Sequence, residues 1–400
     1  GRNLRLTPLH DRLAAHGAFF GERAGWERAS WFAPPPATVL NELTFERPLW
    51  HDCVAREHRA ARETVALFDQ STFGKLLVQG DDTLDFLQRV CAGNMDVPVG
   101  RIVYTPMLNH RGGFESDLVA QRIGVDRYML ITGAAQPVRD AHLLRRQLRE
   151  REFVTITDMT SAFAVLGVMG PASRQLLMRL TDAALDNRAF PYMSHAEIDI
   201  AGTVARAARI SYAGELGWEL HVPCEAAVPL YDALWEAGQD LGLVNAGSAA
   251  LAGLRLEKGY CSFGHDIGPD DTPLEAGLGF TCKLDGALSF NGREALQRQR
   301  ECGVSRRRVV LAAADPQVQL LGNEPIFMDG EIVGHTTSAA YGHSVGRAVA
   351  MGYVRLDGRD LASLLRDAVF ELEIALQRVP VSASHRALLD PRGERLRADA

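Results

Sequence analysis

Two short stretches, N-H-R-G-G-F-E-S-D-L at residues 109–118 and Y-A-G-E-L-G-W-E at residues 212–219, decide most of what this sequence predicts about its fold. Each places one carboxylate beside a glycine turn. In the first, Gly112 and Gly113 are typical of a hairpin turn that leads into an extended segment running to about Ile123. Asp117 is therefore expected on a strand rather than on a loop.

The second stretch also predicts a hairpin. Alternation from Val204 to Tyr212 meets a glycine-containing turn and resumes at Trp218. Because side chains alternate across a strand, Glu219 and His221 are expected on the face opposite the tryptophan. Taken alone, either carboxylate is more often a solvated or hydrogen-bonded structural group than a functional one.

Outward from these stretches, strand and helix patterns occur twice. Strands near residues 75–78, 103–108, 114–123 and 128–132 alternate with helices at 81–91 and 137–150, and a similar series follows from residue 162. The strand connections are too short for parallel crossovers, which indicates antiparallel α+β units. From about Ser305 short strands with glycine turns replace this pattern, and Asp329-Gly330 is a clear two-residue hairpin signal.

We therefore predict an α+β protein with a C-terminal β-barrel or jelly-roll domain. The expected divisions are an N-terminal extension with the start of the first domain (1–50), a first α+β domain (51–155), a second α+β domain (156–304) and the barrel (305–400).

Composition limits the class of protein. The 400 residues are 46% hydrophobic and 23% charged, which fits a globular protein of two or three domains. No apolar run is long enough to span a membrane and no signal-peptide pattern begins the chain, so a cytoplasmic protein, or a matrix protein in a mitochondrion, is expected. The net charge of −7 argues against general nucleic-acid binding.

The six cysteines are scattered, with no C-x-x-C pair and no grouping with histidine. This spacing predicts reduced thiols and no metal site.

The two opening stretches, with Y-T-P-M-L-N at 104–109 and L-R-L-E-K-G-Y at 254–260, resemble the tetrahydrofolate-binding aminomethyltransferase family, the T-protein of glycine cleavage and its relatives. The resemblance covers nearly the whole chain. It is greatest to the C-terminal folate-binding half of dimethylglycine and sarcosine dehydrogenases, through L-T-P-L-H-D-R-L at 6–13 and D-T-P-L-E-A-G-L-G-F at 271–280. It implies three domains in a cloverleaf around a central folate channel.

Those flavoproteins carry an FAD domain before this half, but no G-x-G-x-x-G opens a strand–turn–helix unit here. The sequence therefore predicts tetrahydrofolate as cofactor and no FAD site in this chain. Either an FAD-dependent amine oxidase domain or subunit is its partner, or the chain works alone.

The resemblance also implies roles for individual residues. Glu219 occupies the position of the pterin-binding glutamate, and a carboxylate can accept both hydrogens of a pterin donor pair. Tyr212 matches the tyrosine that packs on the pterin, and Asp117 matches the essential acid–base aspartate. Four further positions match residues that line the folate: Tyr104, Ile131, Phe280 and Phe73.

Three positions depart from the family pattern. Ser116 stands where a second acid is common, Leu251 replaces an arginine near the cofactor, and Gly133 replaces a folate-contacting asparagine. The changes at Leu251 and Gly133 weaken a glycine-cleavage assignment and are tolerated in the dehydrogenase-like relatives, whereas Ser116 leaves Asp117 as the one candidate acid at its position. Arg255 and Glu257 are expected in internal ion pairs with partners on neighbouring elements rather than in catalysis.

Three function classes follow from the resemblance. The first is one-carbon transfer from an oxidised N-methyl amine, such as dimethylglycine or sarcosine, to form 5,10-methylenetetrahydrofolate. The second is a glycine-cleavage-type aminomethyltransferase or a folate-dependent demethylase. The third is a non-enzymatic folate-binding protein that assists iron–sulfur enzymes, although the expected K-G-C-Y-x-G-Q-E motif is here K-G-Y-C-S-F-G-H at 258–265.

Overall fold

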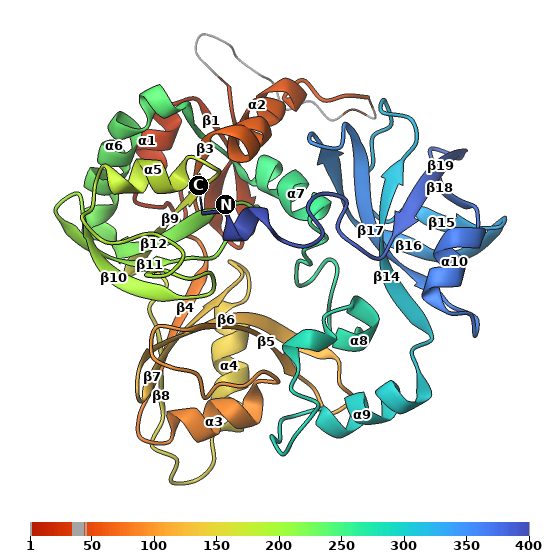
Figure 1. Ribbon diagram of the computed structural model, residues 1–400, viewed down its shortest axis with the longest axis horizontal. Coiled ribbons are helices and arrows are strands. Elements are labelled where there is room, and N and C mark those ends of the chain that lie inside the picture. Colours follow the sequence, from red (N-terminus) through yellow and green to blue (C-terminus); the bar gives the residue numbers. More distant parts are fainter. Residues whose placement is uncertain (1, 34–43, 45, 400) are drawn as a thin grey trace.

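The structure is a computed structural model that describes residues 2–33, 44 and 46–399. Its elements form three bodies, each with its own hydrophobic core (Figure 1). Part of the predicted N-terminal extension, residues 34–43, lies outside the described residues. The chain begins with α1 (His10–Ala15) and an antiparallel hairpin of β1 (Ala18–Arg23) and β2 (Trp26–Phe32), followed by α2 (His51–Glu63).

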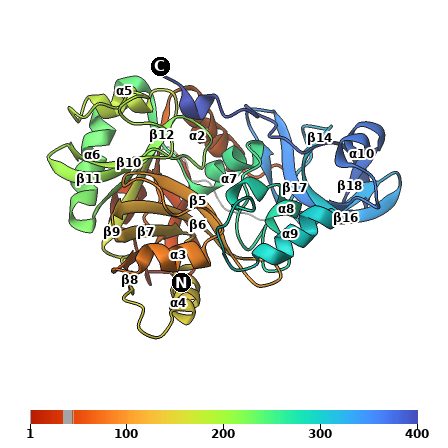
Figure 2. The ribbon, with the colours of Figure 1, turned by 60° about the horizontal axis from the view of Figure 1, so that its bottom comes forward.

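The first body is a five-stranded antiparallel sheet in the order β5-β6-β7-β4-β8. α3 (Thr83–Val90) and α4 (Pro137–Gln147) lie on one side of it, where Phe86 and Leu144 pack on Leu118 and Leu130 (Figure 2). The predicted turn at Gly112 is confirmed, with φ of 84° there. The strands are β4 (Gly74–Gln79), β5 (Ile102–Leu108), β6 (Phe114–Gly124), β7 (Arg127–Thr132) and β8 (Thr155–Asp158).

The second body is a six-stranded sheet in the order β10-β11-β12-β9-β3-β13, antiparallel except for the β3–β13 pair. α5 (Ser173–Met178) and α6 (Ala227–Ala237) cover one face, where Trp218 and Leu220 are fully buried. The strands are β3 (Val65–Asp69), β9 (Phe163–Met169), β10 (His195–Ile200), β11 (Thr203–Ala208), β12 (Gly217–Pro223) and β13 (Leu243–Asn245).

Strand pairing adds a detail to the predicted domain division. β3 lies inside the range 51–155 expected for the first domain, yet it pairs with β9 and β13 of the second sheet. The first sheet therefore begins at Gly74. The exact domain boundaries stay a prediction.

The C-terminal body is a closed barrel, β14-β17-β16-β15-β18-β19, with α10 (Leu361–Asp367) beside it. This confirms the predicted barrel. Asp329 and Gly330 form its predicted two-residue turn, with φ of 52° and 89°, values that suit a type I′ hairpin. The strands are β14 (Arg306–Ala313), β15 (Pro325–Met328), β16 (Glu331–Gly342), β17 (Arg347–Arg355), β18 (Phe370–Ile374) and β19 (Gln377–Ser384).

α7 (Ser248–Glu257) joins the bodies: it packs on α2 and β2 on one side and on β16 and β17 of the barrel on the other (Figure 1). The expected ion pairs of this segment are confirmed, Arg255 with Asp266 at 2.6 Å and Glu257 with Arg62 at 2.9 Å. The remaining short elements are α8 (Pro273–Ala276), α9 (Arg293–Cys302), η1 (Cys224–Ala226), η2 (Gln239–Leu241), η3 (Gly279–Thr281) and η4 (Arg395–Arg397).

Candidate functional site

Asp117 and Tyr104 form a hydrogen-bonded pair on the face of the first sheet that α3 and α4 do not cover. Along β6, Leu118 points into the helix-covered core, so Asp117 points the opposite way. Register places Pro106 opposite Asp117 and Tyr104 opposite Val119, which makes Tyr104 and Asp117 diagonal neighbours. The Tyr104 hydroxyl donates to Asp117 Oδ2 at 3.0 Å. The two residues are half-buried.

The surroundings of Asp117 favour its protonated form. Burial raises the pKa of Asp117 to about 6, the hydrogen bond from Tyr104 opposes this rise, and the charge of Asp140 adds to it. Asp140 is fully buried on α4 and accepts hydrogen bonds from Ser116 at 2.8 Å and Thr132 at 2.5 Å. A side chain with a pKa near 6 can hold or release a proton close to neutral pH.

Sequence reasoning did not single out Asp140. It contacts Ser116, which stands where the family that the sequence resembles often has an acid. Because Ser116 and Asp117 are consecutive on a strand, they point to opposite faces, and Asp140 therefore lies behind the sheet from Asp117. A polar residue at a core-facing helix position is the signal that could have found it.

Glu219 and His221 lie on β12 and point away from the core that contains Trp218 and Leu220, as predicted. Glu219 is 6% exposed and His221 is 3% exposed. Glu219 Oε2 lies 3.8 Å from His221 Nε2, and Gln121 Nε2 of the first sheet lies 3.5 Å from the same ring nitrogen. The uncovered faces of the two sheets therefore meet at His221.

Burial dominates the electrostatics of this pair. It raises the pKa of Glu219 to about 7, opposed by the nearby amide of Gln70, and it lowers the pKa of His221. No donor of the described residues makes a hydrogen bond of good geometry to the Glu219 carboxylate, and the Gln70 amide only lies near it. A buried carboxylate with so few donors is suited to a ligand that brings its own N–H groups.

Tyr212 lies near the Asp117 pair, but on a loop rather than on the predicted strand. β11 ends at Ala208, because Arg209 instead exchanges backbone hydrogen bonds with the segment before β10, and the chain leaves the sheet until Gly217. Tyr212 donates to the Cys261 carbonyl at 2.8 Å and stacks on Tyr260 at 6.1 Å. Burial is the main cause that raises the pKa of Tyr212, and the charge of Asp117 contributes, so the two side chains are near each other.

The other residues predicted to line the folate differ in position and burial. Ile131 is opposite Val119 in the sheet, on the Asp117 face, and is 5% exposed. Phe73 is half-buried in the turn between β3 and β4. Phe280, on η3, is 79% exposed, so its ring is not packed into the protein, and its contact with a ligand stays a prediction.

Lys75 is a second residue that sequence reasoning missed. Its side chain is buried, and Nζ donates to the carbonyls of Ser71, Phe73 and Thr160 at 2.8, 2.9 and 3.0 Å. Burial lowers the pKa of Lys75 to about 8. These bonds anchor the turn that carries Phe73 and joins the two sheets.

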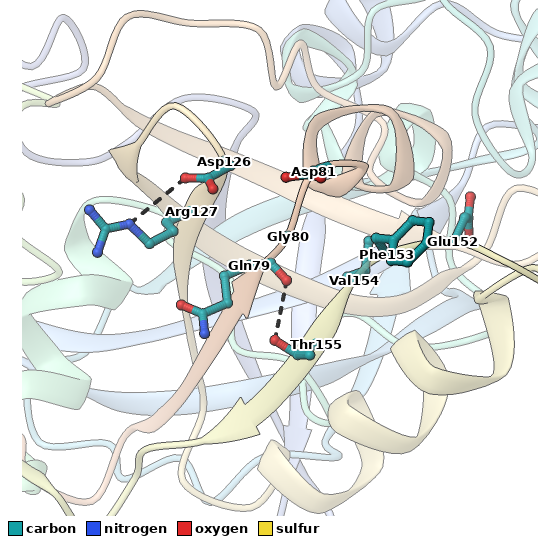
Figure 3. Close-up of a pocket in the computed structure, with 9 residues that line it drawn as sticks. All are labelled: Gln79, Gly80, Asp81, Asp126, Arg127, Glu152, Phe153, Val154 and Thr155. Atoms are coloured by element: carbon teal, nitrogen blue, oxygen red, sulfur yellow. Dashed lines mark hydrogen bonds and ion pairs between the residues drawn. The ribbon is translucent and has the colours of Figure 1, made fainter.

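A separate open groove lies at the edge of the first sheet (Figure 3). It has a volume of about 620 Å³ and contains none of the predicted site residues. It is lined by Gln79, Gly80, Asp81, Asp126, Arg127, Glu152, Phe153, Val154 and Thr155.

The described residues contain neither a membrane-spanning helix nor a metal-binding cluster. No helix among them is both long and apolar enough to cross a membrane. No cluster of histidine, cysteine, aspartate or glutamate in the same part of the chain is arranged to hold a metal ion.

Comparison with known proteins gives consistent matches along the chain. Residues 9–286 match the family described as the GCVT N-terminal domain, and residues 306–390 match the glycine cleavage T-protein C-terminal barrel domain. The structure resembles the crystal structure of the glycine cleavage system aminomethyltransferase T from Bartonella henselae, with a TM-score of 0.81 and 26% identity, over 97% of this chain and 99% of that one.

Two curated relatives match over 99% of this chain. The 4-methylaminobutanoate oxidase (formaldehyde-forming) of Paenarthrobacter nicotinovorans is 42% identical, and the match covers 47% of its length. Human mitochondrial sarcosine dehydrogenase is 37% identical, and the match covers 48% of its length. The chain thus spans about half the length of these relatives.

Proposed function

Because this chain belongs to the glycine cleavage T-protein family, we propose that it is a tetrahydrofolate-dependent one-carbon transferase. The proposed reaction captures an iminium or formaldehyde equivalent from an oxidised N-methyl amine and forms 5,10-methylenetetrahydrofolate. The likeness to sarcosine dehydrogenase and 4-methylaminobutanoate oxidase supports an amine donor of this kind. An FAD-dependent amine oxidase domain or subunit is the proposed partner that would supply it.

The observation that carries this proposal is the buried carboxylate of Glu219. With a pKa near 7 and no hydrogen bond of good geometry from the described residues, Glu219 suits a ligand edge that presents two adjacent N–H groups. The 2-amino group and ring N–H of a pterin form such an edge. In the proposed site, Tyr212 supplies an aromatic face for the ring, and Ile131 with Phe73 supplies apolar contacts.

Asp117 is the proposed catalytic residue. Tetrahydrofolate supplies the nucleophilic nitrogens that accept the one-carbon unit. Asp117, in its ionised form, would stabilise the positive charge that develops beside it and move a proton at its Oδ2 atom. Tyr104 holds that oxygen in place through its 3.0 Å hydrogen bond. The raised pKa of Asp117 places its proton exchange near neutral pH.

A glycine-cleavage-type aminomethyltransferase is the second candidate. The match to the aminomethyltransferase T structure along 97% of this chain favours it. Leu251 and Gly133, which replace polar cofactor-contacting residues of the glycine-cleavage pattern, favour the amine-oxidase-linked reaction instead. Activity that depends on a lipoyl-bound aminomethyl donor would favour the glycine-cleavage-type reaction.

The test is Asp117→Asn, which keeps the size of the side chain and removes its charge. We expect formation of methylenetetrahydrofolate to fall at least roughly a hundredfold, the scale of a positioned acid–base group, while tetrahydrofolate affinity changes only a few-fold. The assay uses a formaldehyde donor with the spontaneous condensation subtracted, and tetrahydrofolate binding is measured by calorimetry.

Asp126→Asn is the matched control, because Asp126 is an exposed carboxylate in the β6–β7 turn. It should leave rate and affinity unchanged. If Asp117→Asn forms product at the wild-type rate above background, Asp117 is structural and the protein is better described as a folate-binding module.

A further inference from the structure

Gln70 has a buried side chain whose amide makes no hydrogen bond of good geometry with the described residues. The residue is 4% exposed, and neither Nε2 nor Oε1 makes a hydrogen bond of good geometry. Nearly all buried polar groups in folded proteins are paired, so an amide with both atoms unpaired requires an explanation. A ligand that supplies the missing partners is one such explanation, and the position of Gln70 favours it.

The amide lies on the second sheet next to Glu219. Gln70 directly follows β3, and its backbone N–H donates to the Val165 carbonyl of β9 at 2.8 Å. Its side chain lies over Gly167, where an added Cβ atom would be only 2.3 Å from Gln70 Oε1. Gly167 is the cross-strand partner of Glu219, so the Gln70 amide and the Glu219 carboxylate share one face of the sheet.

A second unpaired atom lies beside His221, the neighbour of Glu219 on the same face of β12. Gln121 is fully buried, and its Oε1 has no partner, while its Nε2 faces His221. Two buried amides with unpaired atoms therefore lie in the surroundings of one carboxylate, Gln70 over its cross-strand partner and Gln121 beside His221. Amide groups of this kind, together with the carboxylate, can form hydrogen bonds with a flat heterocycle at more than one position of its edge.

We infer that Gln70 is a specificity-determining residue that recognises the 4-oxo group of the pteridine ring. This inference rests on the proposed function. One edge of the ring presents the 2-amino group, the N3 hydrogen and the 4-oxo oxygen in that order, which is donor, donor, acceptor. The two oxygens of Glu219 and the Nε2 of Gln70 present the complement, which is acceptor, acceptor, donor.

The inference predicts how the protein discriminates between two related ligands. Aminopterin carries a 4-amino group in place of the 4-oxo group of folic acid, and its N3 atom also loses the hydrogen that faces Glu219. The change at N3 is the same for wild type and for variants at Gln70, so a comparison of the two proteins isolates the contact at position 4. A 4-amino group cannot accept a hydrogen bond from Nε2, so the donor of Gln70 would stay unpaired against it. A site that leaves a buried polar group unpaired binds the mismatched ligand more weakly.

The experiment measures calorimetric affinities of the purified chain for 5-formyltetrahydrofolate, folic acid and aminopterin. The variants are Gln70→Met, which keeps the length of the side chain, and Gln70→Leu, which changes its shape. We expect both to lose about tenfold in affinity for the two 4-oxo ligands, the effect of one buried hydrogen bond, and to keep their affinity for aminopterin within about twofold. Gln79→Met, at the distant groove of Figure 3, is the control and should change nothing.

Thermal unfolding of the ligand-free variants separates recognition from a structural role. Because the Gln70 amide makes no hydrogen bond of good geometry with the described residues, replacing it with an apolar side chain should leave the unfolding temperature unchanged or raise it. If wild type binds none of the 4-oxo ligands, the proposed function itself fails. If wild type binds them but both variants keep the same ratio between folic acid and aminopterin, or lose stability and all affinities together, the inference about Gln70 is wrong and the proposed function stands.

Discussion

Replacing Glu219 with glutamine should raise the free energy of unfolding of the ligand-free protein and at the same time lower its affinity for tetrahydrofolate. The carboxylate is 6% exposed and its pKa is raised to about 7, chiefly by burial. The folded protein therefore binds the proton of this group more tightly than the unfolded chain does. The charged form that would bind a pterin is the form that folding disfavours.

The magnitude follows from the two pKa values. The pKa of about 7 in the folded protein compares with 4.5 for an ordinary glutamate, and each tenfold in proton affinity is ~1.4 kcal/mol. A raised pKa adds stability below the unfolded value, and this is lost as pH rises through the folded value. At pH 8 the buried charge thus lowers the free energy of unfolding by about 3 kcal/mol, and at pH 5 by only about 1 kcal/mol.

Glu219→Gln removes this charge but leaves a buried amide, so we expect a gain of about 1 to 3 kcal/mol at pH 8 and little gain at pH 5. Thermal unfolding of wild type and variant at pH 5, 6, 7 and 8, without ligand, measures the difference. Calorimetry at pH 8 should show tetrahydrofolate affinity reduced by about 1 to 3 kcal/mol, since one acceptor of a buried donor pair is lost. A stability difference that does not grow with pH, or an unchanged affinity, would refute the reasoning.

Two further predictions concern groups around the site. Tyr104→Phe removes the hydrogen bond that lowers the pKa of Asp117, so that pKa should rise above 6. The acidic limb of the pH–rate profile should then move to higher pH. A limb that does not move would show that this hydrogen bond does not control the pKa of Asp117. Arg255→Leu leaves Asp266, which is 1% exposed, without its 2.6 Å ion-pair partner. We expect the free energy of unfolding, measured in urea, to fall by about 3 to 5 kcal/mol. A fall below about 1 kcal/mol would mean that other groups compensate the charge of Asp266.

Local pattern was enough to predict the elements that carry the two carboxylates. Glycine turns and strict alternation place Asp117 on β6 and Glu219 on β12, because side-chain direction on a strand repeats every two residues. The same reasoning failed at Tyr212, where alternation continued in the sequence but the backbone left the sheet after Ala208. Alternation cannot show where the hydrogen-bonding partner of a strand ends.

Only the tertiary structure decided which sheet each strand joins and which polar groups meet. Val65–Asp69 precedes β4 in the chain but pairs in parallel with Leu243–Asn245 of the second sheet, a contact that no local signal encodes. The proximity of Gln70 to Glu219 and of Asp140 to Ser116 likewise depends on strand register and helix packing.

The sequence by itself determined the classes of the domains, the turns and the faces on which the acids lie, because these depend on local propensity and on the period of the strand. The tertiary structure decided how strongly each acid is desolvated and which amides remain unpaired. The burial of a side chain and the pairing of its polar atoms depend on how all the elements pack together. They set the pKa values of about 6 and 7 for Asp117 and Glu219, on which the proposed chemistry depends.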